Sequence, residues 1–178
     1  THFSYKNAER FSRLKFAANE YRAGLINGNS KAFENVLNNL SKVVTNGPND
    51  DYDLGGIYLK IITKMQLEEY SGALEDIKDL LSWYNSNRNN NEYYFPESGL
   101  SNLYYDLAIY SGVCLLNTQN KDAEESFNSA INIFPERWEA WFYLSLYNYL
   151  NNNTEEAIRS INKSINFGID LVSALNFR

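Results

Sequence analysis

The sequence predicts an all-α fold built from successive helical hairpins. The segment 123–130 is matched 34 residues later by the segment 157–164, with small and bulky residues at corresponding places. A period of this length is typical of a helix–turn–helix unit that stacks on its neighbours. Elsewhere, apolar residues recur at spacings of three and four, which is the pattern of amphipathic helices. No sustained alternation of apolar and polar residues predicts a strand.

Length and composition limit the classes of protein to consider. The 178 residues are enough for one domain, 1–178, with a continuous core. The formal net charge is -6 and no block of basic residues is present, which argues against a nucleic-acid partner. No apolar run approaches the roughly 18 residues that direct membrane insertion requires. Cys114 is the single cysteine, so an intramolecular disulfide is excluded, which fits a cytoplasmic location.

The first half of the chain predicts two hairpins followed by an insertion. Apolar stripes at helical spacing predict a divergent hairpin over 8–45 and a repeat over 54–84. Ala73 and Ala123 occupy corresponding places in their hairpins but lie 50 residues apart, which exceeds one period by 16. The asparagine-rich stretch between them cannot form a core. We therefore expect an inserted loop over 85–101.

The second half contains two repeats, 104–137 and 138–171, that align without gaps. Their first helices place two bulky residues and a small one at matching positions: Leu107, Tyr110 and Ser111 in one, Trp141, Leu144 and Ser145 in the other. Their second helices share a small–bulky–small pattern: Ala123, Phe127 and Ala130 in one, Ala157, Ile161 and Ser164 in the other. Small side chains allow two helices to approach closely.

This pattern resembles the signature of the tetratricopeptide repeat (TPR) family. The resemblance implies a right-handed α-α solenoid of about three to four hairpins and a role in protein–protein interaction. It departs from the signature at Asn148, where a larger apolar residue is usual, and at Ile169, which replaces a closing proline. Residues 170–178 are expected to form a terminal capping helix or to lead into further repeats.

The residues for chemical catalysis are missing from the sequence. His2 is the only histidine and Cys114 the only cysteine, so the sequence lacks the set of residues that zinc binding or Cys–His catalysis requires. Paired acids such as Glu124 and Glu125 fall at predicted helix starts, where they complement the helix dipole. We therefore predict no catalytic residue, no metal ligand and no cofactor, and we expect the chain not to be an enzyme, although a regulatory module attached to an enzyme remains open.

The TPR resemblance implies a binding groove, because the first helix of each hairpin lines the concave face. The positions on that face that the core leaves unused are largely apolar and aromatic. The candidate protein-binding residues are Tyr105, Ile109, Gly112, Leu116, Glu139, Phe142, Tyr143, Leu146 and Tyr149. Gly112 is expected to let the backbone of a partner approach. The expected ligand is an apolar helix or an extended segment of a protein or peptide.

Other occupants and functions of the groove stay open at this point. TPR co-chaperones that grip a C-terminal carboxylate use lysine, arginine and asparagine on this face, whereas Ala108, Ile109, Gly112, Glu139 and Tyr143 stand here. A carboxylate clamp is therefore disfavoured. The apolar segment 93–96, an N-terminal helix or a second copy of the chain could instead fill the groove. In that case the protein would be a structural subunit of a larger complex.

Overall fold

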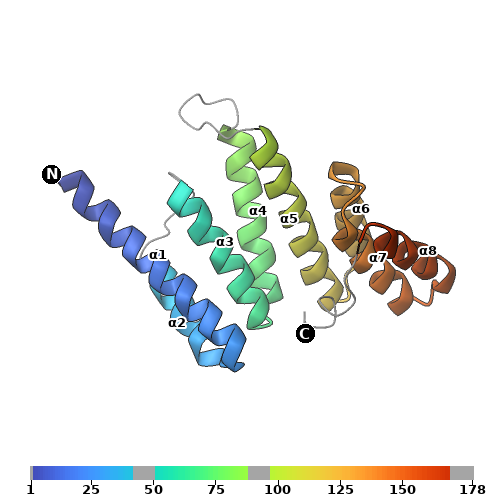
Figure 1. The fold of residues 1–178 in the computed structure, drawn as a ribbon, viewed down its shortest axis with the longest axis horizontal. Coiled ribbons are helices and arrows are strands. Elements are labelled where there is room, and N and C mark those ends of the chain that lie inside the picture. The colour runs from blue at the N-terminus through green and yellow to red at the C-terminus, as the bar shows by residue number, and fades with distance from the viewer. Residues whose placement is uncertain (1, 42–50, 88–96, 169–178) are drawn as a thin grey trace. The chain divides into compact units, whose positions relative to one another are not determined.

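The computed structural model describes residues 2–41, 51–87 and 97–168. These residues form eight α-helices, which pair in chain order into four hairpins, and the all-α prediction is confirmed (Figure 1). The helices are α1 (His2–Asn27), α2 (Ser30–Leu40), α3 (Asp51–Gln66), α4 (Tyr70–Asn87), α5 (Glu97–Asn117), α6 (Ala123–Ile133), α7 (Trp138–Leu150) and α8 (Thr154–Asn166). The chain divides into two compact units, 1–94 and 95–178, each with two hairpins.

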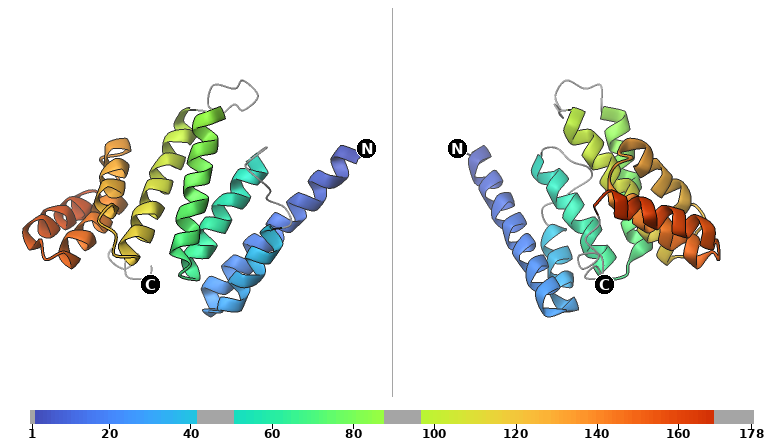
Figure 2. Two further views of the ribbon diagram at one scale, coloured as in Figure 1. Left: turned by 180° about the vertical axis from the view of Figure 1, so that it is seen from behind. Right: turned by 45° about the vertical axis from the view of Figure 1, so that its right-hand side comes forward.

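All four hairpins turn in the same way. In each hairpin, the turn that follows the first helix contains a residue with a positive φ of 57–61°: Gly28, Glu68, Gln119 and Asn152. The N–H of the following residue donates to the carbonyl five residues back, with N···O distances of 2.8–3.2 Å. Together these features are the Schellman motif, which satisfies carbonyls that the helix end leaves without partners. The paired helices can be followed in two further views (Figure 2).

The core of the first unit joins its two hairpins. Ala17 of α1 and Val36 and Leu40 of α2 are buried together, and Leu59 of α3 packs against them. Small Ala17 lets α1 and α2 approach closely, and the branched side chains of α2 fill the space toward α3. Tyr21 and Phe33 add an aromatic contact between α1 and α2, with ring centroids 5.5 Å apart. The first hairpin is thus anchored on the second by apolar burial.

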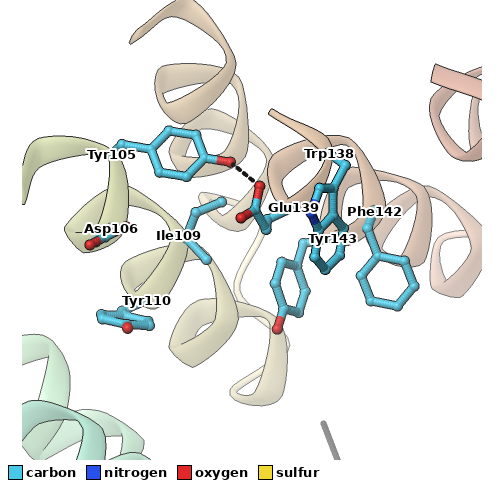
Figure 3. A pocket seen from close by; sticks show the side chains of 8 residues that line it. All are labelled: Tyr105, Asp106, Ile109, Tyr110, Trp138, Glu139, Phe142 and Tyr143. Atoms are coloured by element: carbon cyan, nitrogen blue, oxygen red, sulfur yellow. Dashed lines mark hydrogen bonds between the residues drawn. The ribbon is translucent and has the colours of Figure 1, made fainter. Parts of the chain in front are cut away.

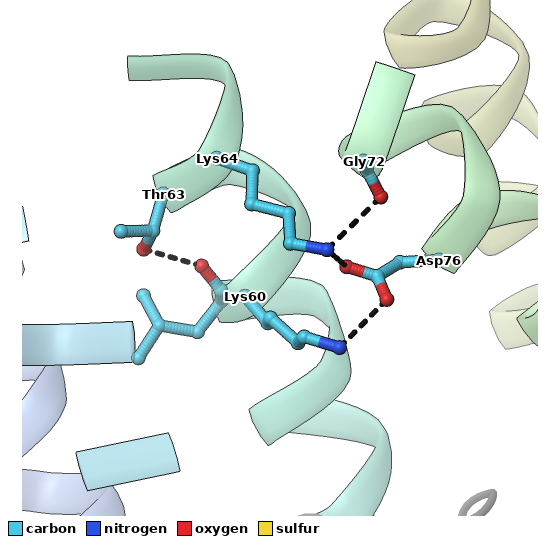
Figure 4. A network of polar contacts seen from close by, with 6 residues as sticks. Lys60, Thr63, Lys64, Gly72 and Asp76 are labelled. Atoms are coloured by element: carbon cyan, nitrogen blue, oxygen red, sulfur yellow. Dashed lines mark hydrogen bonds and ion pairs between the residues drawn. The ribbon is translucent and has the colours of Figure 1, made fainter. Parts of the chain in front are cut away.

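A polar network joins α3 to α4 in the same unit (Figure 4). Asp76 of α4 accepts ion pairs from Lys60 Nζ at 2.7 Å and from Lys64 Nζ at 2.6 Å, both on α3. Lys64 Nζ also donates to the carbonyl oxygen of Gly72 at 3.1 Å. The Asp76 side chain is only 12% and the Lys64 side chain 16% exposed, so their ion pair is largely shielded from water.

The core of the second unit follows the repeat pattern. Phe127 of α6 is fully buried between Ala123 and Ala130, which are also fully buried. Ser164 Oγ of α8 donates to the Trp138 carbonyl oxygen at 3.1 Å, so the small residue at this repeat position links α8 to α7. The small residues predicted for close helix contact are therefore buried in both hairpins, except Ser111, which is half-buried.

Gly112 of α5 lies directly against the Phe127 ring. A Cβ atom at position 112 would fall 2.3 Å from Cε1 of Phe127. We expect Gly112→Ala to lower the free energy of unfolding by about 1–2 kcal/mol, because overpacking costs 1–3 kcal/mol while alanine improves helix propensity by up to about 1 kcal/mol. Urea unfolding followed by circular dichroism measures the change.

Gly55 of α3 provides the matched control for this substitution. A Cβ atom there would have no neighbour within 4 Å, so Gly55→Ala is expected to stabilise the protein by roughly 0.5–1 kcal/mol. Equal shifts of the same sign for both variants would contradict the packing of Gly112 on Phe127.

The predicted 85–101 loop is too long, because helices occupy both of its ends. The helix α4 continues to Asn87 and α5 begins at Glu97. Asparagine and serine are tolerated near helix ends, and Gly99 inside α5 costs only about 1 kcal/mol. Composition therefore overstated the length of the loop. The remainder of that loop, 88–96, and the predicted capping helix, 170–178, lie outside the described residues.

Candidate functional site

A pocket opens between α5 and α7, the first helices of the two hairpins in the second unit (Figure 3). Its volume is about 200 Å³. Each helix contributes four lining residues: Tyr105, Asp106, Ile109 and Tyr110 from α5, and Trp138, Glu139, Phe142 and Tyr143 from α7. Two helices one repeat apart therefore build a concave site from aromatic rings and two carboxylates.

The α7 side of the pocket is a connected set of rings. Phe142 packs edge-on against Trp138 and against Tyr143, with ring centroids 6.4 and 5.4 Å apart. Tyr143 also stacks on the buried ring of Phe127, with centroids 5.7 Å apart and planes inclined by 11°. Since Phe127 belongs to the core, its stacking contact restricts the Tyr143 ring, and the Tyr143 ring in turn packs against Phe142.

A hydrogen bond joins the two helices across the pocket. The Tyr105 hydroxyl of α5 donates to Oε2 of Glu139 on α7 at 3.1 Å, and the two residues are 34 positions apart. Burial, and then the Glu139 carboxylate, raise the pKa of Tyr105 well above its usual range. Burial likewise raises the pKa of Tyr143, with smaller contributions from Tyr110 and Glu139. Both hydroxyls therefore keep their protons at neutral pH, and Tyr105 remains a donor to Glu139.

Arg137 is not a lining residue, but it packs over the ring of Tyr105, which is one. Its guanidinium lies 4.8 Å from the ring centroid of Tyr105 and 4.5 Å from that of Phe134. It also donates to Oδ1 of Asn102 on α5 at 2.6 Å. The cation is thus placed on two aromatic faces and bonded to the neighbouring helix, which fixes the Tyr105 ring.

The predicted binding residues fall into several environments. Five of the nine line the pocket: Tyr105, Ile109, Glu139, Phe142 and Tyr143. Of these, Tyr105 is only 2% and Ile109 only 6% exposed, so they form its floor. Leu116 lines a separate, more polar depression at the far end of α5, with Asn117, Asn120 and Tyr147 among its neighbours.

The other three predicted residues lie outside both hollows. Leu146 and Tyr149 are exposed on α7. Gly112 is buried, and its missing side chain makes room for Phe127 of this chain. The expected close approach at Gly112 is therefore made by α6. The protein-binding role of the nine residues stays a prediction.

Three pocket residues were not among the predicted binding residues. Trp138 and Tyr110 match the helical spacing of core positions, and that spacing does not tell a core face from the wall of a groove. Asp106 lies three and four positions before Ile109 and Tyr110, so it shares their face of α5. A carboxylate on an otherwise apolar stripe was the signal that could have identified it.

The rest of the described chain offers little other chemistry. No group of three or more histidine, cysteine, aspartate or glutamate side chains within 2–41, 51–87 and 97–168 is arranged to hold a metal ion. Cys114 is fully buried, and burial raises the pKa of its thiol to about 12, so it is a packing residue rather than a thiolate nucleophile. Among the described helices, none has the length and apolar character needed to cross a membrane.

Comparison with known proteins gives similarity of structure only. No protein-family model and no curated protein matches the sequence. A crystal structure of MamA superposes with a TM-score of 0.60 at 17% identity, covering 89% of this chain and 77% of MamA. MamA MSR-1 gives a TM-score of 0.58 at 13% identity, over 92% of this chain and 96% of the other.

A third structure, MamA AMB-1, covers 98% of both chains with a TM-score of 0.55 and 14% identity. At sequence identities this low, the similarity supports a common fold and no conclusion about function. The agreement nevertheless extends across most of the chain in each case. The structure is therefore similar to that of MamA, a TPR-containing protein, and the resemblance to the TPR fold is confirmed.

Proposed function

We propose that the chain is a non-catalytic adaptor that binds a segment of another protein in the pocket between α5 and α7. The observation that carries this proposal is the pocket itself, in which aromatic rings from two successive repeats surround a concave opening. TPR-type folds use this face for protein–protein interaction, and rigid aromatic side chains are the residues that dominate binding energy at interfaces.

The size of the pocket supports a side chain of a partner rather than a cofactor. Its volume of about 200 Å³ is below the roughly 300–1,000 Å³ of sites that enclose a drug-sized ligand. A single large side chain projecting from a bound segment fits this space. The two carboxylates at the pocket disfavour the C-terminal carboxylate that clamp-type co-chaperones bind, because like charges repel.

A second candidate function is that of a structural subunit whose interface lies elsewhere. Large apolar side chains are exposed on α7, on α8 and just after α8: Leu146, Tyr149, Leu150, Ile158, Ile165 and Phe167. Such a surface can pack against a neighbouring protein in an assembly. The segment 93–96, which could fill the groove, lies outside the described residues.

A peptide-display selection against the purified chain tests the adaptor function. The affinities of selected peptides are then measured by fluorescence polarisation for the wild type and for Phe142→Ala. We expect the substitution to weaken binding at least tenfold, since truncating a hot-spot residue at the centre of an interface costs about 2 kcal/mol or more. Circular dichroism checks that the variant is folded.

The matched control for this experiment is Ile158→Ala on α8, which removes an exposed apolar side chain outside the pocket. It is expected to leave the affinity unchanged. Peptides that bind Phe142→Ala as well as the wild type would contradict the adaptor proposal. Loss of binding only in Ile158→Ala would favour the structural-subunit function.

A further inference from the structure

The pocket between α5 and α7 combines two features that together select the charge of its occupant. Its walls carry the faces and edges of Tyr110, Trp138, Phe142 and Tyr143. It also contains two carboxylates, Asp106 on one helix and Glu139 on the other (Figure 3). None of the eight lining residues is a lysine or an arginine. The lining is therefore mainly aromatic and includes two acidic side chains and no basic one.

We propose that this pocket binds a cationic side chain, lysine or arginine, of the partner segment. The proposal rests on the adaptor function and specifies the chemistry of its ligand. The negative face of an aromatic ring attracts a cation, and the attraction grows when the cation is partly desolvated. A carboxylate beside the rings adds a charge-assisted hydrogen bond, which is about twice as strong as a neutral one. The long apolar stem of either side chain can lie along the rings.

The Glu139 carboxylate is held in position for this role. The Tyr105 hydroxyl donates to its Oε2 at 3.1 Å, which restricts the carboxylate while leaving Oε1 for another donor. The donor is a neutral hydroxyl, so the hydrogen bond orients the carboxylate without cancelling its charge. Tyr105 is itself fixed by burial and by the Arg137 guanidinium over its ring. Such preorganisation reduces the cost of ordering the site when a ligand binds.

Two cations among the described residues of this unit already lie over aromatic rings of the chain. Arg137 lies over the rings of Tyr105 and Phe134 and donates to Asn102. Lys163 of α8 lies 3.9 Å from the ring centroid of Trp141, which is not a pocket residue. The same unit therefore already pairs cations with aromatic rings at two places, which is the kind of contact that we propose for a cation of the partner.

Other classes of occupant fit the site less well. A phosphate or carboxylate group would meet two like charges, which lowers its affinity. A purely apolar side chain would take the Glu139 carboxylate further out of water without donating to its second oxygen, and removing a charge from water without compensation is costly. Charge complementarity thus favours a cation, and the overall net charge of -6 favours its approach.

Titration of capped amino acids tests the proposal directly. The probes are Nα-acetyl-lysine N-methylamide, its arginine counterpart and the neutral norleucine compound, which matches the lysine stem. Binding is followed by NMR at the Trp138 indole N–H of the full chain. We expect the better of the two cationic probes to bind at least tenfold more tightly than the norleucine probe. Equal affinities for charged and neutral probes would overturn the proposal.

An isosteric substitution isolates the contribution of the charge. Glu139→Gln retains an oxygen that can accept from Tyr105 but removes the negative charge, so we expect a loss of about fivefold or more in affinity for the better cationic probe. Glu136→Gln is the control, because Glu136 is exposed and lies outside the pocket lining. An equal loss in both variants would show a general effect of net charge and would also overturn the proposal.

The two proposals fail in different ways. If the selected peptides depend on Phe142 but contain no enriched lysine or arginine and are insensitive to Glu139→Gln, the adaptor function stands and the cationic ligand is wrong. If a cationic probe binds in a Glu139-dependent manner but no selected peptide depends on Phe142, the cation site stands and the adaptor function is wrong.

Discussion

Replacing Phe127 with alanine is expected to lower the free energy of unfolding by about 3–5 kcal/mol, the range for deleting a buried aromatic side chain. The ring is fully buried, fills the space beside Gly112 and stacks on Tyr143 with centroids 5.7 Å apart. Its loss removes apolar contacts from α5 and α7 and leaves a cavity that the surrounding helices cannot fill without moving. Urea unfolding monitored by circular dichroism measures the change.

Phe16 of α1 is the size-matched control, because 53% of its surface is exposed. We expect Phe16→Ala to change the free energy of unfolding by less than about 0.5 kcal/mol. The Phe127→Ala variant should also weaken binding at the pocket, since Tyr143 loses the ring on which it rests. A cost below about 1 kcal/mol for Phe127→Ala would contradict the packing of α6 between α5 and α7.

The second large effect is expected at Asp76, whose replacement by alanine should cost about 2–3 kcal/mol. The substitution removes the ion pairs to Lys60 and Lys64 and leaves the Lys64 ammonium, whose side chain is 16% exposed, with the Gly72 carbonyl as a partner. Breaking a fully buried pair costs 3–5 kcal/mol. The Lys60 side chain is 35% exposed and can return to water, which reduces the loss.

Asp79 lies three residues further along α4 and is exposed, so Asp79→Ala is the matched control with the same change of charge. Its effect should remain within about 0.5 kcal/mol. Both variants are measured by chemical unfolding with and without 1 M sodium chloride. The Asp76→Ala loss should persist in salt, because shielded pairs are weakly screened. A loss that disappears in salt would mean that the pair behaves as a surface contact.

The helical organisation of this protein could be predicted from local signals. The repeated small–bulky–small patterns that begin at Ala123 and Ala157 both lie in helices, α6 from Ala123 and α8 from Thr154. The loop bounds were less accurate, because asparagine-rich composition does not fix where a helix frays. The common turn of the four hairpins was not apparent either. Gly28 and Asn152 are residue types that favour the left-handed conformation, whereas Glu68 and Gln119 adopt it in turns closed by the Schellman hydrogen bonds.

Asn148 illustrates how local hydrogen bonds allow a polar residue at a position where the repeat favours an apolar one. It occupies a position where the repeat pattern favours a larger apolar residue, yet it is buried and donates to the Leu144 carbonyl oxygen at 3.1 Å. Asn153 Nδ2 in the following turn donates to its Oδ1 at 3.4 Å. The neighbouring Tyr147 is buried, while Tyr149 is 67% exposed. The amide is accepted because its polar atoms find partners within the hairpin.

The sequence by itself determined the all-α class, the four hairpins and the face of α5 and α7 from which a site would be built. Helical periodicity contains that information, because residues three and four apart share a face. Only the tertiary structure decided which residues of that face remain open. Gly112 is covered by Phe127, and Tyr105 and Ile109 form a floor, whereas Phe142 and Glu139 line the opening. That division depends on how the neighbouring helices pack against one another, and contacts between side chains distant in sequence are not encoded in the period of a single helix.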